Sequence, residues 1–323
     1  MPPRRTRKKN IRKRAQRKRV YIGGQGQDRQ IFVSMLTGEG LGNQLFIFAA
    51  ALVAQKKTGL PISVLPSTTN PHTKIDYRTL FKTPKISVVE EANGKSRMNA
   101  ANSILEIQDF NATAKWSNAN IKYNSGSTKN TKLPARLYQN YSAIHNVIPA
   151  VKDILTANEF SKKPTYKEIQ DATPSGSAFI HVRRGDYKDR GQGWLLGQDY
   201  FLRGLDELEK DPKIKTIWII SKDMDWCKGL PWASHTKKPI NYYDSANELE
   251  VLYKMSVCTA GAVISSSTFS AWGAMLGADR NHSATIVYPI GWLTHDADGD
   301  NPLTFPDRWK GIPNTDGTST LTL

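Results

Sequence analysis

Two adjacent arginines are the residues of this sequence with the clearest chemical use. Arg183 and Arg184 stand in the run His-Val-Arg-Arg-Gly-Asp-Tyr at residues 181–187, at the end of a predicted strand. A guanidinium is planar, always charged and able to donate to two oxygens at once, so the pair suits a diphosphate. Asp186 could hold one of the arginines or accept a proton. An exposed Arg–Asp pair without a catalytic role, worth about 0–1 kcal/mol, is the alternative.

A glycine-rich segment at residues 38–44, Gly-Glu-Gly-Leu-Gly-Asn-Gln, could bring the backbone close to a ligand. Gly40 and Gly42 have no side chain to prevent that approach. Asn43 and Gln44 open a predicted helix, whose first turn offers unpaired N–H groups to an anion. An ordinary glycine turn is the alternative. The segment lacks the Lys-Ser/Thr pair of a P-loop, which disfavours ATP hydrolysis.

A cluster of hydroxyl side chains at residues 265–273 follows another predicted strand and begins another predicted helix. Such a cluster can bind phosphate together with the positive end of the helix dipole. An ordinary Ser/Thr helix cap is the alternative. The candidate contacts with substrate are Ser267, Thr268, Phe269 and Ser270.

All three segments follow predicted strands, and open α/β sheets bind their ligands beyond the carboxyl ends of the strands. The apolar pattern predicts strands at residues 31–36, 62–65, 179–182, 216–220, 241–243, 262–264 and 285–288. It predicts helices at residues 43–57, 199–208, 248–258 and 269–276. This alternation indicates a mostly parallel sheet covered on both faces. The predicted fold class is therefore α/β, and two such halves facing across a cleft would suit a nucleotide-sugar enzyme.

The net charge of +16 comes largely from one end of the chain. Residues 1–19 contain eleven Lys or Arg and no acid, whereas the remainder is nearly balanced. We expect residues 1–29 to be a disordered basic tail, in which residues 4–19 could attract an anionic membrane surface. Nucleic-acid binding is the rival function for this tail. Because the tail shows no aromatic or base-reading pattern, we expect no specific nucleic-acid partner.

The sequence shows neither an apolar run long enough to span a membrane nor a signal segment. We therefore expect a cytoplasmic protein that is at most peripheral at a membrane. The two cysteines, Cys227 and Cys258, are no disulfide framework and favour a reducing compartment.

Taken together, the three segments resemble the α-1,2-fucosyltransferases, glycosyltransferase family 11, in sequence and in order. The resemblance runs from about Phe32 to Trp309 and leaves the basic tail out. Residues 138–141 also resemble the family's aromatic-Gln segment, and residues 221–226 resemble its Ser-Asp-Asp-x-Glu-Trp turn. The resemblance implies a GT-B fold of two Rossmann-type lobes. We place an N-terminal, acceptor-side lobe at residues 30–165, a C-terminal, GDP-fucose-binding lobe at residues 166–312, and a tail at residues 313–323.

The resemblance also implies inversion, because a β-linked GDP-fucose becomes an α-fucoside. It implies that Arg184 binds the β-phosphate with support from Arg183, and that His181 lies near the nucleotide. It implies that Ser267, Thr268 and Ser270 contact the diphosphate. It also implies that Gly42 and Asn43 face fucose and the acceptor. Asp186 is the nearest carboxylate for the role of general base, and pairing with an arginine is its alternative role.

The predicted function is transfer of L-fucose from GDP-fucose to a galactose-containing glycan, as in a galactoside α-1,2-fucosyltransferase. The alternatives are a catalytically silent GDP-sugar-binding module and a related fucosyltransferase with a protein acceptor. We expect no metal, because an arginine pair stands where metal-dependent enzymes use carboxylates and a cation. Asp223 and Asp225 fall in the family-like turn, so we expect a structural role. Three alternating aspartates resemble a calcium loop but lack its other ligands; they are Asp296, Asp298 and Asp300.

The sequence departs from the family pattern at Val251, where family members usually carry Asp. In related fucosyltransferases a carboxylate in this region is expected to pair with the N1–H and amino group of guanine, and valine cannot accept hydrogen bonds. Glu248 or Glu250 could replace it. We favour Glu250, although a shift of one residue turns a side chain by about 100° around a helix. An exposed helix charge with weak base selection is the alternative.

Overall fold

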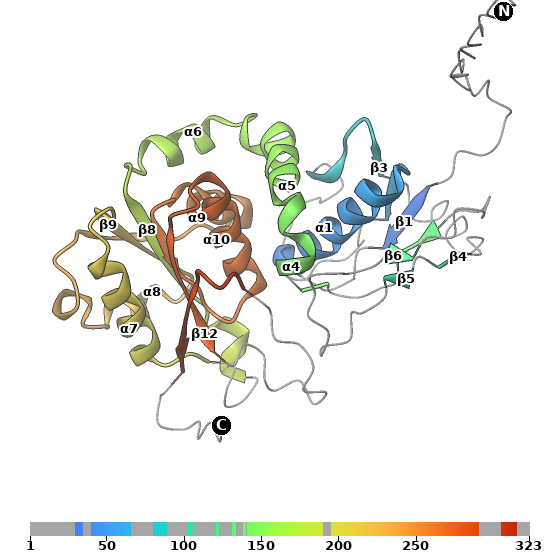
Figure 1. The fold of residues 1–323 in the computed structure, drawn as a ribbon. Coiled ribbons are helices and arrows are strands. Elements are labelled where there is room, and N and C mark those ends of the chain that lie inside the picture. The colour runs from blue at the N-terminus through green and yellow to red at the C-terminus, as the bar shows by residue number, and fades with distance from the viewer. Residues whose placement is uncertain are drawn as a thin grey trace, which may run out of the picture.

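The computed structural model describes residues 30–34, 40–65, 80–88, 103–104, 106–107, 121–122, 131–133, 138–139, 141–189, 195–290 and 305–314. Its architecture is two parallel β-sheets, one from each half of the chain, with helices packed on them (Figure 1). The expected basic tail, including residues 4–19, lies outside the described residues, as does most of the C-terminal tail.

The C-terminal half forms a six-stranded sheet in which all neighbouring strands are parallel. Its strands are β8 (Ser177–Val182), β9 (Thr216–Ser221), β10 (Ile240–Tyr243), β11 (Gly261–Val263), β12 (Thr285–Ile290) and β13 (Lys310–Pro313). The spatial order is β10-β9-β8-β11-β12-β13, so the chain winds from the centre to one edge and then returns to the centre. This is the order of a doubly wound nucleotide-binding sheet, and the winding changes direction between β8 and β11.

Helices cover both faces of this sheet. They are α7 (Gln198–Lys210), α8 (Met224–Lys228), α9 (Glu248–Val257) and α10 (Thr268–Arg280), with short 3₁₀ turns at Gly185–Asp189 and Trp232–Ser234. Side chains of β8 alternate between the faces, as the pleat of a strand requires. Ala178 and Ile180 belong to the core under α7, whereas Phe179 belongs to the core under α9 and α10. Figure 1 shows α7 and the pair α9 and α10 on opposite sides of the strands.

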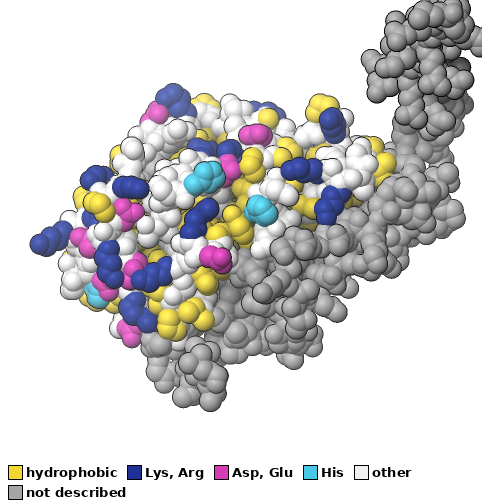
Figure 2. Space-filling model, in the orientation of Figure 1, with side chains coloured by type: hydrophobic (Ala, Val, Ile, Leu, Met, Phe, Trp, Pro, Cys, Tyr) yellow, Lys and Arg dark blue, Asp and Glu magenta, His cyan; other side chains and the backbone are white. Residues whose placement is uncertain are grey.

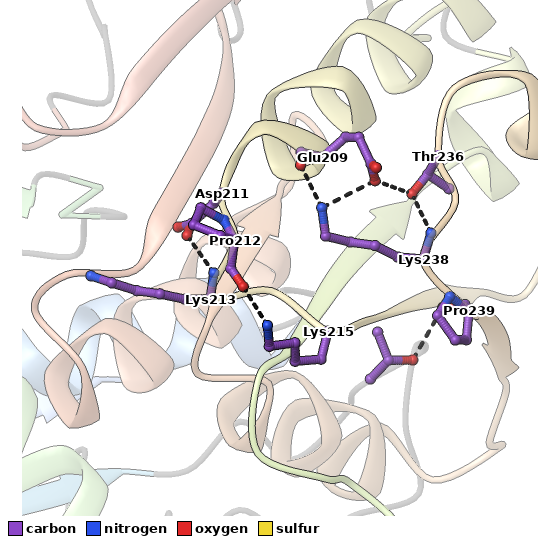
Figure 3. Close-up of polar contacts among 9 residues, drawn as sticks. Glu209, Asp211, Pro212, Lys213, Lys215, Thr236, Lys238 and Pro239 are labelled. Carbon is purple, nitrogen blue, oxygen red and sulfur yellow. Dashed lines mark hydrogen bonds and ion pairs between the residues drawn. The ribbon is translucent and has the colours of Figure 1, made fainter.

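The amino-terminal edge of this sheet is held by polar contacts at the end of α7 (Figure 3). Lys238 Nζ donates to Glu209 Oε2 over 3.1 Å, and the Thr236 hydroxyl donates to the same carboxylate. Lys215 Nζ donates to the Pro212 carbonyl over 2.7 Å. These lysines therefore serve the scaffold, at the edge opposite to the carboxyl ends of the strands.

The N-terminal half forms a five-stranded sheet with the order β3-β2-β1-β7-β4, again parallel throughout. The strands are β1 (Ile31–Ser34), β2 (Ile62–Leu65), β3 (Ile86–Val88), β4 (Ser103–Ile104) and β7 (Thr131–Lys132). Two further strands, β5 (Glu106–Ile107) and β6 (Ile121–Lys122), pair antiparallel. The rest of residues 90–135 is outside the described residues, except for Leu133.

Helix α1 (Leu41–Thr58) joins the two halves of the molecule. Every residue from Gln44 to Ala54 is buried, so the helix has no polar face. A helix that is apolar all round needs partners on several sides. Its own sheet is one partner and α10 is another. The Phe46 ring meets the Trp272 ring edge-on, with centroids 5.3 Å apart.

Residues 141–171 connect the halves through short helices, and no element was predicted there from the sequence. The helices are α4 (Tyr141–Ile144), a 3₁₀ turn (His145–Val147), α5 (Ile148–Leu155), a π turn (Thr156–Phe160) and α6 (Pro164–Asp171). Lys152 of α5 forms an ion pair with Asp279 near the end of α10. The connection is therefore fastened to the C-terminal half.

The predicted α/β class with two parallel, Rossmann-type units is confirmed. The lobe boundaries stay predictions. Both cysteines are buried and free. On the face shown in Figure 2, acidic and basic side chains are interspersed, as the nearly balanced charge of the body implies. Within the described residues, no helix combines the length and apolar character that a membrane crossing requires.

Candidate functional site

Ser265 joins the ends of the two central strands of the C-terminal sheet. Its hydroxyl donates to the His181 carbonyl at the end of β8 and accepts from the Arg183 N–H over 3.0 Å. Its own N–H donates to Ser270 Oγ in α10 over 3.2 Å. Ser265 is 1% exposed, so these contacts are shielded from water. The arginine and hydroxyl segments therefore meet where the winding changes direction, the usual ligand position in such sheets.

Arg183 is the arginine that pairs with Asp186, through its Nη2. Both side chains are about one-third exposed, at 36% and 35%. The Arg183 Cζ also lies 5.4 Å from the centre of the Tyr187 ring, and the Tyr187 hydroxyl donates to the Ser266 carbonyl over 2.9 Å. Of the two roles predicted for Asp186, the structure thus shows the pairing with an arginine.

Arg184 has a different environment. Its Cζ lies 4.1 Å from the centre of the Trp226 ring, which is a cation–π distance. Its Nε is buried and has no hydrogen-bond partner among the described residues. A buried, unpaired guanidinium nitrogen is costly, and a bound anion would satisfy it. Arg184 therefore fits a ligand contact better than Arg183 does.

Asp223 supports the arginine loop from the turn between β9 and α8. It accepts from the Gly185 N–H over 3.0 Å and pairs with Lys188. Burial opposes its ionisation, but the hydrogen bonds from Lys188 and Gly185 hold the pKa of Asp223 below its ordinary value. Gly185 has φ of +31°, which disfavours any side chain there. Asp223 thus stabilises the arginine loop.

Metal-binding groups are not assembled around the site in the part of the chain that the structure describes. There, no three His, Cys, Asp or Glu side chains are close enough together to hold an ion. The three alternating aspartates at residues 296–300 lie outside this part.

His181 is buried beside the hydroxyl segment. Its ring meets the Phe269 ring edge-on, with centroids 6.0 Å apart. Burial, helped by the charge of Arg183, lowers the pKa of His181 to about 3. The imidazole is therefore neutral at physiological pH and a poor proton acceptor, and its place fits packing near a ligand.

The glycine segment and the hydroxyl segment touch through Gly42. A Cβ at this position would lie 2.3 Å from Phe269 N and 2.6 Å from the Thr268 carbonyl carbon, so only glycine fits. The first turn of α1 therefore abuts the first turn of α10. Gly40 precedes α1 in an extended conformation, and its carbonyl accepts from the N–H groups of Asn43 and Gln44, both over 3.1 Å.

The hydroxyl side chains of the third segment have different roles. Ser267 is the N-cap residue of α10 but makes no side-chain capping hydrogen bond, so its hydroxyl is not used by the helix. Ser270 is fully buried and accepts from Ser265 N–H, which makes it a support of the loop. Thr268 and Phe269 are half-buried beside Gly42. Ser267 and Thr268 are therefore the better candidates for contact with a diphosphate.

Comparison with known proteins assigns the chain to a family. The model of glycosyl transferase family 11 matches residues 129–292, slightly more than half of the chain. The chain belongs to glycosyl transferase family 11. The matched residues include the arginine and hydroxyl segments and begin after the glycine segment. The resemblance seen in the sequence is thereby confirmed for the family.

Individual relatives of this family 11 chain are distant. An α-1,2-colitosyltransferase of Escherichia coli is 24% identical over 153 residues, which are 45% of this chain and only about half, 51%, of that protein. The O-antigen biosynthesis glycosyltransferase WbnK of Escherichia coli is 24% identical over 317 residues, covering 86% of this chain and 99% of that protein. The fucosyltransferase NodZ from Bradyrhizobium has a TM-score of 0.46 at 14% identity, over 77% of this chain and 93% of that chain. A similarity this weak carries no argument about substrates.

Glu250 lies at the start of α9 in this family 11 chain. Its carboxylate accepts from the Ser245 hydroxyl over 2.7 Å and from Asn247 Nδ2 over 3.1 Å. Asn247 in turn caps α9 by accepting from the Leu249 N–H. Val251 is only 7% exposed and belongs to the apolar core. The carboxylate at this end of the helix is therefore fixed one residue before Val251.

Three residues that support the family 11 site were not selected from the sequence. Ser265 lay inside a recognised segment, and Trp226 and Gln139 lay inside the two weaker similarities. Each acts on a residue of another element, as Gln139 does by donating to Asn43 over 2.8 Å. Only the resemblance drew attention to their segments, and no local pattern identifies such partners.

Proposed function

We propose that this family 11 protein transfers L-fucose from GDP-fucose to a hydroxyl of a galactose-containing glycan, with inversion. The observation that carries the proposal is the environment of Arg184. The side chain lies where the winding changes direction, and its Nε is buried without a partner among the described residues. A planar, permanently charged fork in that position suits the diphosphate of a sugar nucleotide.

In the proposed reaction, the acceptor hydroxyl displaces GDP in one in-line step through an oxocarbenium-like state. Negative charge develops on the departing diphosphate. Arg184 and the positive end of α10 stabilise that charge without having to reorganise. Ser267 and Thr268 add hydroxyl donors beside it. Asp186 holds Arg183 in this proposal and does not take the acceptor proton. As the new glycosidic bond forms and the bond to GDP breaks, that proton passes to solvent water.

No metal is required by this scheme, because arginine supplies the positive charge. In this proposal the Glu250 carboxylate accepts hydrogen bonds from guanine, in place of the Asp that is usual in the family. The carboxylate is fixed in the first turn of α9, which follows the carboxyl end of β10. Asn43, in the first turn of α1, faces the transferred sugar and its acceptor.

A second donor is favoured by one observation. One of the two E. coli relatives described above is an α-1,2-colitosyltransferase, so a colitosyl nucleotide is the alternative to GDP-fucose. The name of the same relative supports a 1,2 linkage, although its match covers only about half of that protein.

The test is an assay of the purified protein with GDP-fucose, GDP-colitose and GDP-mannose against a panel of galactosides. Linkage in the product is read by NMR. We expect α-1,2-linked fucose and at least a hundredfold lower turnover for Arg184→Ala, about the effect of removing one preorganised donor. Arg203→Ala is the matched control, because Arg203 of α7 donates to the Pro313 carbonyl.

Each other outcome has a defined meaning. GDP binding without turnover would favour the silent binding module, and transfer only to protein would favour the alternative acceptor. Near-normal turnover by a folded Arg184→Ala protein would remove this arginine from the mechanism.

A further inference from the structure

Gln139 is a buried amide that contacts the first turn of α1. It is 5% exposed and lies just before α4, outside both sheets. Its Nε2 donates to Asn43 Oδ1 over 2.8 Å. Burying a primary amide costs free energy unless it is well hydrogen-bonded, so this contact stabilises the pair in one arrangement.

The backbone next to Gln139 is strained. Tyr138 has φ of +52°, and among the described residues it is the only one other than glycine with positive φ. An aromatic residue in that region is uncommon and its backbone is unfavourable there. Tyr138 is itself 3% exposed, so packing holds it there. Strain of this kind persists where the surroundings impose it, often at functional sites. Here the strained residue is followed directly by the amide that reaches Asn43.

The hydrogen bond sets the orientation of the Asn43 amide. An asparagine side chain has one accepting oxygen and one donating nitrogen. Because Oδ1 faces the Gln139 donor, Nδ2 occupies the other branch of the amide. Asn43 is half-buried and follows Gly42, which touches Thr268 and Phe269. The Nδ2 group of Asn43 therefore lies in the first turn of α1, where the two halves of the protein meet.

We propose that Gln139 is a positioning residue, which holds the Asn43 amide so that Nδ2 donates to an oxygen of the transferred sugar or the acceptor. This inference rests on the function proposed above. Donation to an oxygen of the reacting sugar strengthens as the bonds reorganise, so orientation should affect turnover more than donor binding. A purely structural glutamine would affect stability instead.

The test is a double-mutant cycle on turnover with the full chain, using Gln139→Ala, Asn43→Ala and the double variant. We expect Gln139→Ala to lower kcat about tenfold, with KM for the donor changed less than twofold. In the Asn43→Ala background, the same change should have no further effect on kcat, because it acts through the missing amide. Multiplicative losses in the double variant would overturn the proposal.

Gln139→Glu sharpens the test. The substitution keeps the size of the side chain, but the carboxylate only accepts hydrogen bonds and would turn the Asn43 amide around. We expect a loss in kcat at least as large as that of Gln139→Ala in a protein that still unfolds cooperatively. Asn158→Ala is the control, because Asn158 bridges to the Leu80 and Lys82 carbonyls away from the site. Unchanged kcat in Gln139→Glu would refute the positioning role.

Failure of the proposed function remains distinguishable from failure of this inference. A wild type that transfers no sugar contradicts the proposed function. The inference is then decided by the ¹⁵N resonances of the Asn43 side-chain amide, identified by their loss in Asn43→Ala. Gln139→Glu must shift them and Asn158→Ala must not. Resonances that do not move in Gln139→Glu would overturn the inference regardless of activity.

Discussion

The guanidinium carbon of Arg184 lies 4.1 Å from the centre of the Trp226 indole ring. Trp226 belongs to α8, and the turn that leads into α8 also supplies Asp223, which accepts from the Gly185 N–H. One short segment after β9 therefore supports the arginine loop at two points. The indole covers one face of the guanidinium, and the fork at its edge still suits an anion.

The first prediction concerns this indole. Trp226→Leu should lower turnover about tenfold, because loss of a partly desolvated cation–π contact costs roughly 1–2 kcal/mol and frees the arginine to rotate. Trp226→Phe keeps an aromatic face and should lose less. Steady-state kinetics at saturating donor decide the matter. Equal activity of the Leu and Phe variants would mean that the ring face does not position Arg184.

The second prediction is that transfer does not depend on a metal ion. Activity should be unchanged in excess EDTA. Asp223→Asn should lower activity by loosening the loop at Gly185 and Lys188, and added manganese or magnesium should not restore it. Loss in EDTA that is reversed by either metal would make Asp223 and Asp225 ligands.

The third prediction concerns recognition of guanine. Glu250→Gln should raise KM for GDP-fucose tenfold or more, because a poorly paired buried donor of guanine costs about 1–3 kcal/mol. Selectivity for fucose should stay the same, since the base lies far from the sugar. Glu248→Gln, two residues earlier on α9, is the matched control. Normal KM in both variants would place base recognition elsewhere.

The fourth prediction concerns stability and pH. Lys254 of α9 is 1% exposed, its Nζ lies 3.1 Å from the centre of the Trp218 ring, and it donates to Thr173 Oγ1 over 2.7 Å. Burial lowers the pKa of Lys254 from 10.5 to about 8. Between these values the unfolded chain binds more protons than the folded one. The contribution of Lys254 to the free energy of unfolding therefore rises with pH across that window and is constant below it.

The measurement for this lysine is urea unfolding of wild type and Lys254→Met from pH 7 to pH 10.5. Buried Cys258, whose pKa burial raises to about 12, pulls the other way, so the difference between the two proteins is the relevant quantity. Between pH 7 and pH 10.5 the difference in free energy of unfolding should change by up to about 3 kcal/mol in favour of the wild type, because only the wild type has this lysine. A difference that does not vary with pH would contradict the expected protonation.

The sequence predicted the C-terminal sheet well, because parallel strands buried on both faces appear as continuous apolar runs. The run expected at residues 216–220 is β9, which extends one residue further. Strand β13 was missed, because its Lys-Gly-Ile-Pro sequence has no such run and lies at an edge of the sheet. Helix α5 contains Ile148, Val151 and Leu155, whose spacing of i, i+3 and i+7 is typical of a helix with one apolar face. No helix was predicted from this spacing.

The segments that form the candidate site could be predicted from the sequence, but the side-chain contacts between them could not. Arg183, Arg184 and the hydroxyl segment follow strands, so their shared edge could be inferred. Asp186 lies in the 3₁₀ turn that follows both arginines and pairs with Arg183, and the sequence does not indicate which arginine it selects. The contact of Gln139 with Asn43 joins residues that are 96 positions apart, and no local periodicity contains that information.

The backbone contact between Gly42 and the Thr268–Phe269 peptide also constrains how the protein can be made. During synthesis, the first turn of α1 emerges long before α10 exists, so the earlier half folds without its partner surface. The site is complete only once the chain has grown past α10 and the second sheet has closed on the first. Contacts of such long range are costly to form early, which makes assembly of the candidate site a late event in folding. A break in the connecting helices would leave two halves, each carrying an unfinished set of donors.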